Sequence, residues 1–494
     1  MSAQALAQAP QAHAADASLL DRIVEQSRVA KSATEHERAR DIISELVREV
    51  LQGTVVLSEN LSATLDARVA QIDALISAQL SEVMHAPEFQ KLESTWRGLH
   101  YLCKHTSTGS MIKIKVMHAT QKELVRDFNT AIDFDQSTLF KKVYEEEFGT
   151  FGGSPFGALI GDYQIGRQPE DMYFVEQMSH VAAAAHAPFI SAASPELFGL
   201  EEFTDLGKPR DLAKVFDTVE YAKWKSFRES EDSRYVGLTL PHFLGRLPYN
   251  PKDGTTVEGF NFVEDVDGSH HDRYLWVNTA YAFAARLTAA FESYGWCAAI
   301  RGVEGGGLVE DLPTHTFKTD DGEIALKCPT EISITDRREK ELSDLGFIPL
   351  VHCKHTDYAA FFGAQSTQKP RKYDLDAANA NAVLSAQLQY MFAVCRIAHY
   401  MKAMMRDKIG SFASASNVED YLNRWISQYV TSDDAASQET KAQFPLREAS
   451  VQVSEVPGRP GVYRAVSFVR PHFQLDELSV SLRLVAELPQ GGKG

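Results

Sequence analysis

The sequence predicts an α/β protein of mixed α+β character with a helical N-terminal region. Apolar residues recur at helical spacing through most of the first hundred residues. Beyond residue 110, short strand-like runs alternate with Ala- and Met-rich helical stretches, an order typical of α/β domains. The chain has 494 residues, of which 44% are hydrophobic, so it is long enough to bury substantial cores in two or three domains.

Charge and cysteine content restrict the class of function. The chain carries 50 Lys and Arg against 67 Asp and Glu, a net charge of -17, which argues against nucleic acid as a partner because phosphate binding needs clustered cations. The five cysteines are scattered and form no C-x-x-C pair, as expected in a reducing cytosol. The N-terminus lacks the features of a secretory signal, and no long apolar run predicts a membrane span. We therefore predict a cytoplasmic protein without membrane insertion.

The N-terminal region predicts a leader followed by several helices. Residues 1–17 are rich in Ala and Gln and predict a disordered leader. Ser18 can cap a short amphipathic helix that continues to Ala30. This segment suits either a linear motif that orders on a partner or a helix docked on its own domain. Longer helices are predicted at Thr34–Leu51, Leu61–Met84 and Glu88–Cys103.

The remaining chain carries both strand and helix signals. Strands are predicted at Met111–Val116, Gly157–Tyr163, Phe189–Ala192, Ala298–Val303, Glu331–Thr335 and Phe347–Val351. Helices are predicted at Leu275–Tyr294, Arg337–Leu345, Asp376–Ile409 and Asn417–Val430. Residues 229–272 contain many Pro and Gly and predict a turn-rich insertion. A final β pair is predicted at Ala449–Val456 and Tyr463–Val469, before the strictly alternating segment Leu478–Leu488.

Short motifs predict no catalytic, cofactor-binding or metal site. Gly302–Gly307 lacks the GK[ST] ending of a phosphate-binding loop, so a flexible loop is predicted. Ser154 lies in a sequence that resembles a nucleophile elbow, but Pro155 lacks the N–H that an oxyanion hole would use. His352–His355 lacks a second Cys/His pair for zinc, and Glu264–Gly268 lacks the terminal Glu of an EF-hand. A cytosolic α/β enzyme with an unrecognised active site is the alternative.

Four long stretches, spread over nearly the whole chain, carry a family resemblance. They are FGTFGGSPFGALIGDY from Phe148, KCPTEISITDRREKELSDLGFIPLVH from Lys327, YAAFFGAQSTQKP from Tyr358 and RPHFQLDELSVSLRLVAEL from Arg470. They resemble the large sheath subunits of type VI secretion systems, the TssC/VipB family. The resemblance implies a phage-tail-sheath-like core with an added outer domain, and a structural protein that is not an enzyme and needs no cofactor.

The resemblance also implies a set of partners. It implies a heterodimer with a small sheath subunit of the TssB/VipA type. Neighbouring sheath heterodimers would then polymerise into a tube, joined to a baseplate, around an inner tube of Hcp-type hexamers. Contraction of the sheath would propel the inner tube, and a ClpV-type AAA+ ATPase would dismantle the contracted sheath.

Three kinds of contact follow from the resemblance together with the residue patterns. Leu19–Arg28 resembles the helix that the disassembly ATPase recognises, through Leu19, Leu20, Ile23, Val24 and Arg28. Leu478–Leu488 is the expected inter-subunit linker strand, through Leu478, Val480, Leu482, Leu484, Val485 and Leu488. An edge strand in its own sheet is the alternative. Polar inner-tube contacts, or else an ordinary solvated surface, are expected at Lys223, Lys225, Lys327, Asp336, Arg337, Arg338 and Glu339.

These expectations divide the chain into four segments. Residues 1–60 are a flexible segment with the ATPase-recognition helix, and residues 61–110 form a helical region that contacts the small subunit. Residues 111–415 form the sheath α/β domains, with the turn-rich insertion near 229–272. Residues 416–494 form a C-terminal sheath-like domain that ends in the linker strand. Apolar stripes from Leu65 to Val83 and after Leu384 fit either the heterodimer interface or core.

Overall fold

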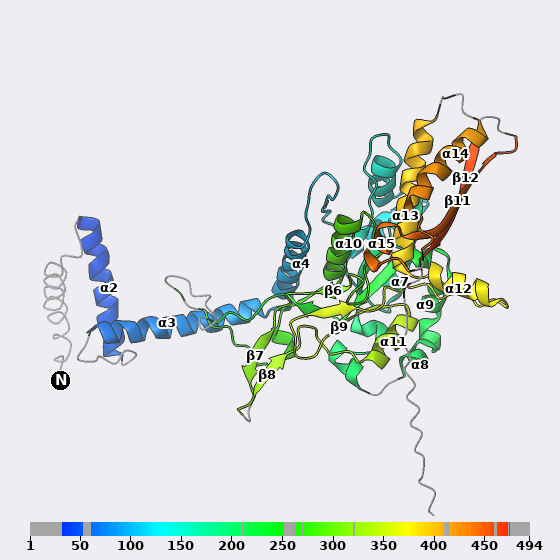
Figure 1. The fold of residues 1–494 in the computed structure, drawn as a ribbon. Helices are drawn as coiled ribbons and strands as arrows, with labels where there is room; N and C mark the ends of the chain where they lie inside the picture. Colours follow the sequence, from blue (N-terminus) through cyan, green and yellow to red (C-terminus); the bar gives the residue numbers. More distant parts are fainter. Residues whose placement is uncertain are drawn as a thin grey trace, which may run out of the picture. The chain divides into compact units, whose positions relative to one another are not determined.

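We describe the protein from a computed structural model (Figure 1). The structure describes residues 32–52, 61–208, 211–250, 260, 262–268, 270–319, 322–409, 411, 414–433, 435–458, 462–472 and 474. The chain forms two compact units. The smaller contains Met1–Met84 with Pro248–Asp265, and the larger contains His85–Leu247 with Val266–Gly494.

The smaller unit contains two long helices, α2 (Ala33–Leu51) and α3 (Leu61–Met84), close to the predicted bounds. Ser32 begins α2 with a capping box, in which its hydroxyl accepts from the N–H of Glu35 and the Glu35 carboxylate accepts from the N–H of Ser32. Arg68 of α3 forms an ion pair with Glu49 of α2. Most of the predicted apolar stripe of α3 is exposed, at Leu65, Val69, Ile72, Ile76 and Val83. These side chains are therefore not core residues of the chain.

A six-stranded sheet forms the centre of the larger unit, in the order β1-β2-β3-β9-β10-β6. Its strands are β1 (Leu159–Ile165), β2 (Phe189–Ala193), β3 (Val236–Leu240), β9 (Ile348–His352), β10 (Ala359–Phe361) and β6 (Leu308–Val309). The first four are parallel, and β10 runs antiparallel to both of its neighbours. Every residue of β2, β3, β9 and β10 is buried, as expected for strands covered on both faces.

Separate hydrophobic cores lie on the two faces of this sheet. Phe189 and Ile190 are consecutive residues of β2 and enter different cores, because successive side chains of a strand point to opposite faces. One core includes α7 (Pro169–Ala185) and α9 (Ala222–Glu229). The other includes α10 (Ala280–Tyr294) and α4 (Pro87–Lys104). A Cβ at Gly98 of α4 would collide with the ring of Tyr281, so glycine permits the close approach of α4 to α10.

Shorter elements complete the larger unit. Its remaining helices before residue 386 are α5 (Gln121–Thr130), α6 (Thr138–Phe140), α8 (Leu212–Phe216), α11 (Asp336–Asp344) and α12 (Asp376–Ser385), with a π-helix, η2, at Lys141–Phe148. The strands β4 (Phe243–Leu244) and β5 (Trp276–Val277) pair with each other, as do β7 (His315–Lys318) and β8 (Ile324–Lys327). Short 3-10 turns are η1 (Phe134–Gln136), η3 (Pro195–Phe198), η4 (Phe203–Gly207), η5 (Val219–Tyr221), η6 (Asp232–Tyr235) and η8 (His271–Arg273).

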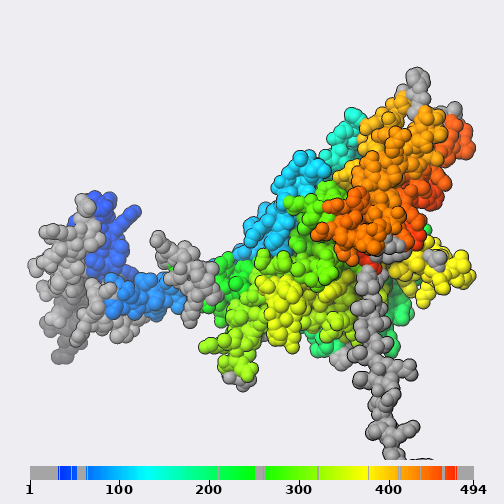
Figure 2. Space-filling model, viewed as in Figure 1, coloured from blue at the N-terminus to red at the C-terminus, as the bar shows by residue number. Residues whose placement is uncertain are grey.

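The C-terminal part of the larger unit has its own core. It contains α13 (Leu388–Asp407), α14 (Ala415–Ile426), η9 (Ser427–Tyr429), α15 (Gln438–Gln443), β11 (Leu446–Glu455) and β12 (Tyr463–Pro471). The third core forms where α13 and α14 pack against one face of the β11–β12 hairpin. In Figure 2 this part forms one continuous orange-to-red surface. Its β pair agrees with the predicted one to within three residues at each end.

Three predicted strands are wrong. In residues Met111–Val116 only Ile112 and Ile114 are half-buried, Val116 is exposed, and the segment pairs with no strand in the described part of the chain. Ala298–Val303 is a loop; in it, the N–H of Gly302 donates to the carbonyl of Phe361. Glu331–Thr335 is irregular, since only the preceding residue, Thr330, forms a β-bridge. Apolar alternation therefore marks a side of the chain that packs, and a strand forms only where a partner edge is present.

Two longer predictions also need correction. Residues 229–272 are not wholly an insertion, because Val236–Leu240 within them is the buried central strand β3. The long helix predicted at Asp376–Ile409 is broken into α12 and α13. At the break the carbonyl of Ala386 accepts from Ser366, and the N–H of Leu388 donates to Ala364. These bonds replace the helical ones.

Candidate functional site

Two of the three predicted contact regions lie outside the described residues. These are the ATPase-recognition helix at Leu19–Arg28 and the linker strand at Leu478–Leu488. Both stay predictions. The last described residue, Gln474, is held by two hydrogen bonds: its N–H donates to Tyr390 Oη, and its Nε2 donates to the carbonyl of Ala298, both at 3.1 Å. The chain therefore leaves the hairpin beside the first turn of α13.

Two lysines of the predicted inner-tube contact lie on α9. Between them, Trp224 is buried and its ring stacks on Phe347, with 5.8 Å between ring centroids. This anchor turns Lys223 and Lys225 away from the core. Lys223 is exposed, and Lys225 forms an ion pair with Asp217 at 3.1 Å. The α9 surface therefore presents cations to solvent, with one of them paired to a carboxylate.

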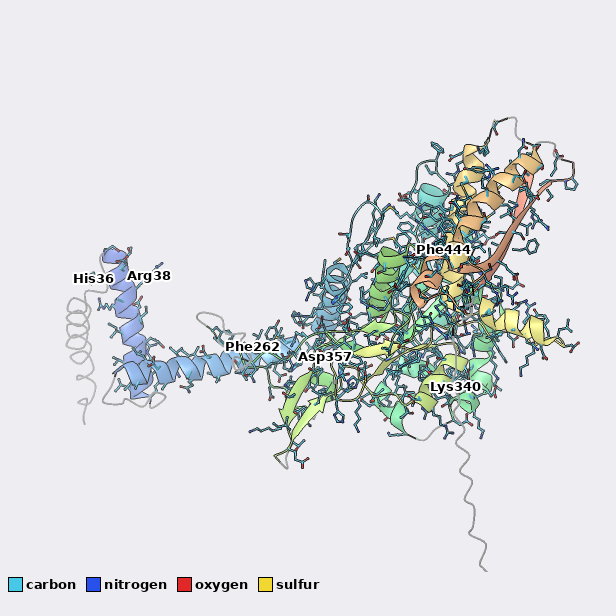
Figure 3. The ribbon with its side chains drawn as sticks, in the orientation of Figure 1. His36, Arg38, Phe262, Lys340, Asp357 and Phe444 are labelled. Atoms are coloured by element: carbon cyan, nitrogen blue, oxygen red, sulfur yellow. The ribbon has the colours of Figure 1, made fainter. Side chains whose placement is uncertain are left out.

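On the charged helix α11, some of the predicted inner-tube contact residues face solvent and others bond to their own chain. Asp336 and Arg337 are exposed. Arg338 instead contacts its own chain, with Nη1 2.6 Å from Glu341 and Nη2 donating to the carbonyl of Lys208. Glu341 also accepts from the N–H of Leu212, which joins α11 to α8. Figure 3 labels Lys340 on the same helix.

Glu339 and Lys327 are also engaged within the chain. Glu339 accepts a 2.9 Å hydrogen bond from Ser343, and burial raises the pKa of its carboxyl. The ammonium of Lys327 lies 4.8 Å from the centre of the Tyr274 ring, and burial lowers the pKa of this lysine. The structure joins α9 to α11, since Nη2 of Arg228 in α9 donates to the carbonyl of Asp344 in α11 at 3.4 Å, whereas Lys327 belongs to β8. Of the seven predicted residues, Lys223, Asp336 and Arg337 are the exposed ones.

The β11–β12 hairpin has one packed face and one exposed face. Its register runs from Glu448↔Arg470 to Glu455↔Tyr463. Val451 and Val469 are among the side chains that face α13 and α14. On the opposite face two apolar side chains of β12 are exposed, Val466 and Phe468, and Val462 just before the strand is exposed as well. Phe444, which precedes β11, is labelled in Figure 3.

Side chains of α14 close the outer edge of β11. Asn423 makes two bonds of 2.8 Å with one residue: its Nδ2 donates to the carbonyl of Val451, and its Oδ1 accepts from the N–H of Val451. The Glu419 carboxylate accepts from the N–H of Val453 at 2.8 Å. The amide of Asn423 therefore takes the place that a peptide group of a neighbouring strand would occupy.

The outer edge of β12 differs, since no strand pairs with it among the described residues. Because Val451 and Val453 turn their backbone groups away from β12, they form the non-hydrogen-bonded pairs of the ladder, opposite Ser467 and Ala465. Ser467 and Ala465 must likewise turn their N–H and C=O groups outward. Within the described part of the chain, the sheet ends at β12. This edge can accept a further strand through backbone hydrogen bonds.

A buried ion pair that the sequence does not predict joins two loops of the larger unit. The Glu331 carboxylate lies 2.7 Å from Nδ1 of His242 and accepts from its backbone N–H at 2.9 Å. His271 lies 3.5 Å from the second oxygen of Glu331. Burial opposes the charge of Glu331, but the charge and hydrogen bonds of His242, together with a hydrogen bond from His271, outweigh it and lower the pKa of Glu331 to about 2. The apolar alternation of Glu331–Thr335 indicated a strand, and this pattern gave no sign that Glu331 forms a buried ion pair.

The short motifs considered for chemistry have structural roles. In the loop at Gly302–Gly307, the N–H of Gly307 donates to the carbonyl of Gly302, so it is not turned toward a phosphate. The N–H of Ser154 donates to the Glu147 carboxylate. No group of three or more His, Cys, Asp and Glu side chains among the described residues is placed to hold a metal ion. None of the described helices is both long and apolar enough to cross a membrane.

Two family models match the chain. Residues 66–368 match the EvpB/VC_A0108 tail sheath N-terminal domain, and residues 377–488 match the EvpB/VC_A0108 tail sheath gpW/gp25-like domain. The type VI secretion system sheath protein TssC1 of Pseudomonas aeruginosa is 51% identical over 460 residues, which cover 92% of each chain. The second match includes the β11–β12 hairpin.

Two solved structures from the anti-feeding prophage are also similar. The match to its baseplate structure has a TM-score of 0.35 and 8% identity, and covers 64% of this chain and 66%, just under two thirds, of the other. The match to its helical sheath in the contracted state has a TM-score of 0.26 and 11% identity, over 72% and 85% of the two chains.

Proposed function

The chain belongs to the EvpB/VC_A0108 tail sheath family and is a contractile sheath subunit of the type VI secretion kind, and from this premise we propose how it works. The protein forms a heterodimer with a small sheath subunit. Heterodimers polymerise in the cytoplasm into a tube on a baseplate, around an inner tube that contraction propels. The work comes from the passage of an extended lattice to one of lower energy. No bond-breaking step by this chain is required.

The open edge of β12 carries this proposal. The segment Leu478–Leu488 of a neighbouring copy would add to the hairpin as a strand, with the outward backbone groups of Ala465 and Ser467 as partners. The position of Gln474 supports a neighbouring copy as the donor. Its bonds to Tyr390 and Ala298 hold the departing chain beside α13, and only residues 475–477 separate it from the linker segment.

Deleting residues 478–494 tests the linker. The truncated chain, co-expressed with the small subunit, should still form heterodimers but no sheath tubes in negative-stain electron microscopy. Deleting residues 489–494 alone is the matched control and should leave tubes intact, because the alternating segment remains. Tubes of normal length from the longer deletion would refute the linker assignment.

The exposed stripe of α3 supports a contact with the small subunit. Five apolar side chains of one helix, each more than 40% exposed, form a larger apolar surface than isolated surface residues do. Replacing Val69 and Ile72 by Asp should prevent co-purification of the small subunit. Replacing Gln71 and Asp73 on the same helix by Ala is the control and should not. Undiminished co-purification of the Asp variant would contradict this contact.

The exposed charges on α9 and α11 support a polar contact with the inner tube. Charge reversal of Lys223 and Arg337 to Glu should leave heterodimers intact and reduce assembly around the inner tube. Polar, solvated contacts of this kind are individually weak, which suits a sheath that must release its tube. Normal secretion by the double variant would rule out these two residues.

The N-terminal helix is proposed as the handle for disassembly. Replacing Leu20 and Ile23 by Asp should spare contraction and block removal of contracted sheaths, because the apolar stripe of Leu19–Arg28 would be lost. Replacing Gln8 and Gln11 in the leader by Asp adds the same charge and is the control. Unchanged binding of the AAA+ ATPase to the first variant in a pull-down would contradict the assignment.

A further inference from the structure

An aromatic groove of about 580 Å³ lies in the larger unit and is bordered by α10, α13 and α15. Six aromatic side chains of the described residues line it, namely Phe291, Tyr294, Trp296, Tyr400, Tyr429 and Phe444. Trp296 is 4% exposed, and the centre of its ring lies 5.0 Å from that of Tyr429 and 6.3 Å from that of Tyr400. The buried indole therefore supports two of the other lining rings. A pre-formed aromatic surface of this kind takes up apolar side chains.

One rim of the groove consists of residues without regular secondary structure. Met111 and Ile112 line the groove and begin the segment Met111–Val116, which pairs with no strand in the described part of the chain. The long apolar side chain of Met111 is 72% exposed. An apolar segment laid in the groove would remove this side chain from water.

A cation with an unfilled hydrogen-bonding position lies beside the groove. The guanidinium of Arg396 is 5.5 Å from the centre of the Phe291 ring and 4.8 Å from that of the Tyr400 ring, and both rings line the groove. Its Nε is buried and has no hydrogen-bond partner among the described residues. A carboxylate is the group that best complements a guanidinium. The groove therefore suits an apolar segment that also carries an acidic side chain.

The described chain ends close to this groove. The N–H of His472 donates to the carbonyl of Pro445, the residue after Phe444 of the groove. Nε2 of Gln474 donates to the carbonyl of Ala298, two residues beyond Trp296. Residues 475–494 follow, and an extended chain covers roughly 3.3 Å per residue. The segment that starts at residue 475 is therefore long enough to enter the groove of its own chain.

The order of residues in this segment matches the order of groups in the groove. Two carboxylates, Asp476 and Glu477, come first and are within a few residues of Gln474. The alternating apolar residues of Leu478–Leu488 come next. The carboxylates complement the charge of Arg396, and the apolar side chains complement the aromatic lining.

We propose that the groove holds residues 475–488 of the same chain before assembly. Asp476 or Glu477 pairs with Arg396, and apolar side chains of Leu478–Leu488 cover the aromatic rings and Met111. An alternating apolar strand displayed on a free subunit can pair with the sheet edges of other copies and cause aggregation. The groove shields this strand until β12 of a neighbouring copy takes it up, and that last step rests on the proposed linker contact.

Limited digestion of the full-length chain with trypsin, in the absence of tubes, tests the docking. Trypsin can cleave Leu478–Leu488 at Arg483, and Lys493 lies beyond this segment. Mass spectrometry gives the rate of cleavage at Arg483 relative to that at Lys493, and a synthetic peptide of residues 475–494 gives the same ratio without a groove. We expect the ratio to be about tenfold lower in the chain, because the segment must leave the groove to be cleaved. Equal ratios would overturn the proposal.

Two matched pairs of variants locate the docking site. Met111→Asp places a charge on the rim and should raise the ratio to that of the peptide. Ile132→Asp changes an apolar residue that is 93% exposed and does not line the groove, so it should leave the ratio low. Asp476→Asn combined with Glu477→Gln should also raise the ratio, whereas Glu487→Gln should not. A low ratio that persists in Met111→Asp would overturn the groove as the docking site.

The dependence on protein concentration identifies the occupant. Docking within one chain gives the same ratio at every concentration. A ratio that falls as the concentration rises would place the segment on another copy and overturn the assignment to the same chain. The linker contact fails by a different result, since it would show as tubes formed by the chain without residues 478–494, with the protection of Arg483 in the full-length chain unchanged.

Discussion

The central sheet and the β11–β12 hairpin of the larger unit differ in how completely their faces are buried and their edges are paired. The central sheet buries every residue of four strands, and hydrophobic cores cover both of its faces. The β11–β12 hairpin packs one face on α13 and α14 and leaves the other face exposed. Asn423 closes one of its edges, and no strand pairs with the other edge within the residues that the structure describes. The central sheet is therefore covered on both faces, whereas the hairpin has the exposed face and edge to which we propose that a neighbouring strand adds.

Under the proposed linker contact, this difference would let a sheath subunit change neighbours without unfolding. A strand added to β12 gains backbone hydrogen bonds whatever its side chains, and it leaves the central sheet untouched. The same logic predicts that substitutions in the two regions differ in kind. In the central sheet they should lower the free energy of unfolding, and in the hairpin they should alter assembly.

Matched phenylalanines give the largest expected difference. Phe189 of β2 is 1% exposed and Phe468 of β12 is 54% exposed. Phe189→Ala should lower the free energy of unfolding by about 3–5 kcal/mol, because it leaves a cavity in a packed core. Phe468→Ala should change it by less than about 0.5 kcal/mol. Urea titration followed by tryptophan fluorescence measures both, since all five tryptophans lie in the larger unit.

The second variant also tests the proposed partner surface. Phe468→Ala should weaken sheath assembly although the chain remains folded, if the exposed face of β12 is covered in the tube. Equal losses of stability in the two variants would show that the hairpin is as tightly packed as the central sheet. That result would remove the distinction between scaffold and partner surface.

Two ion pairs give the next comparison. Glu331 and His242 have side chains 11% and 14% exposed, whereas Glu448 and Arg470 on the hairpin have side chains 65% and 49% exposed. Glu331→Gln should lower the free energy of unfolding by about 3 kcal/mol near pH 6, since it removes one partner of a buried pair. Glu448→Gln is the control and should cost less than about 0.5 kcal/mol.

The buried pair also predicts a pH dependence. Burial alone would lower the pKa of His242, but Glu331 outweighs burial and raises it. Stability from His242 is therefore present below its ordinary pKa, near 6.5, and is lost as pH rises through the raised value. Stability from Glu331 is present above 4.5 and is lost as pH falls toward about 2. The pair should contribute most between those limits, and the loss above pH 6.5 should be smaller in Glu331→Gln. If the free energy of unfolding of Glu331→Gln fell above pH 6.5 as steeply as that of the unmodified chain, the pair would not be the source of this pH dependence.

The sequence predicted the elements whose pattern is local. The helix bounds Leu61–Met84 agree with the structure, and the strand at Phe189–Ala192 is one residue short of β2. The predicted membership in the TssC/VipB family is confirmed by the family models and by the TssC1 relative. Long strings of family residues carry this information even where periodicity does not.

What the sequence did not predict depends on partners distant in the chain. The alternation at Met111–Val116 holds only for Ile112 and Ile114, and no strand pairs with this segment in the described part of the chain. Arg338 lies in a charged run that suggests a solvated helix surface. In the structure its guanidinium instead donates to the carbonyl of Lys208. Asn423 could not be singled out, because an asparagine in a helix acquires the role of an edge cap only once Val451 lies opposite it.

Asn423 provides the smallest expected effect on stability and the sharpest test of the two edges. Asn423→Ala should lower the free energy of unfolding by about 1–2 kcal/mol, because the N–H and C=O of Val451 lose their partners. Asn417→Ala on the same helix is the control, since that residue is exposed. Both can be measured by urea titration.

The structural consequence of Asn423→Ala matters more than its energy. Without the amide, β11 presents outward backbone groups as β12 does, and the hairpin has two edges that can accept a strand. The purified variant should therefore self-associate in size-exclusion chromatography coupled to light scattering, while Asn417→Ala should elute as the unmodified chain does. Unaltered elution of Asn423→Ala, with the expected loss of stability, would mean that Glu419 is sufficient to close β11. The additional variant Glu419→Ala would then have to open the edge, because the Glu419 carboxylate accepts from the N–H of Val453 in β11.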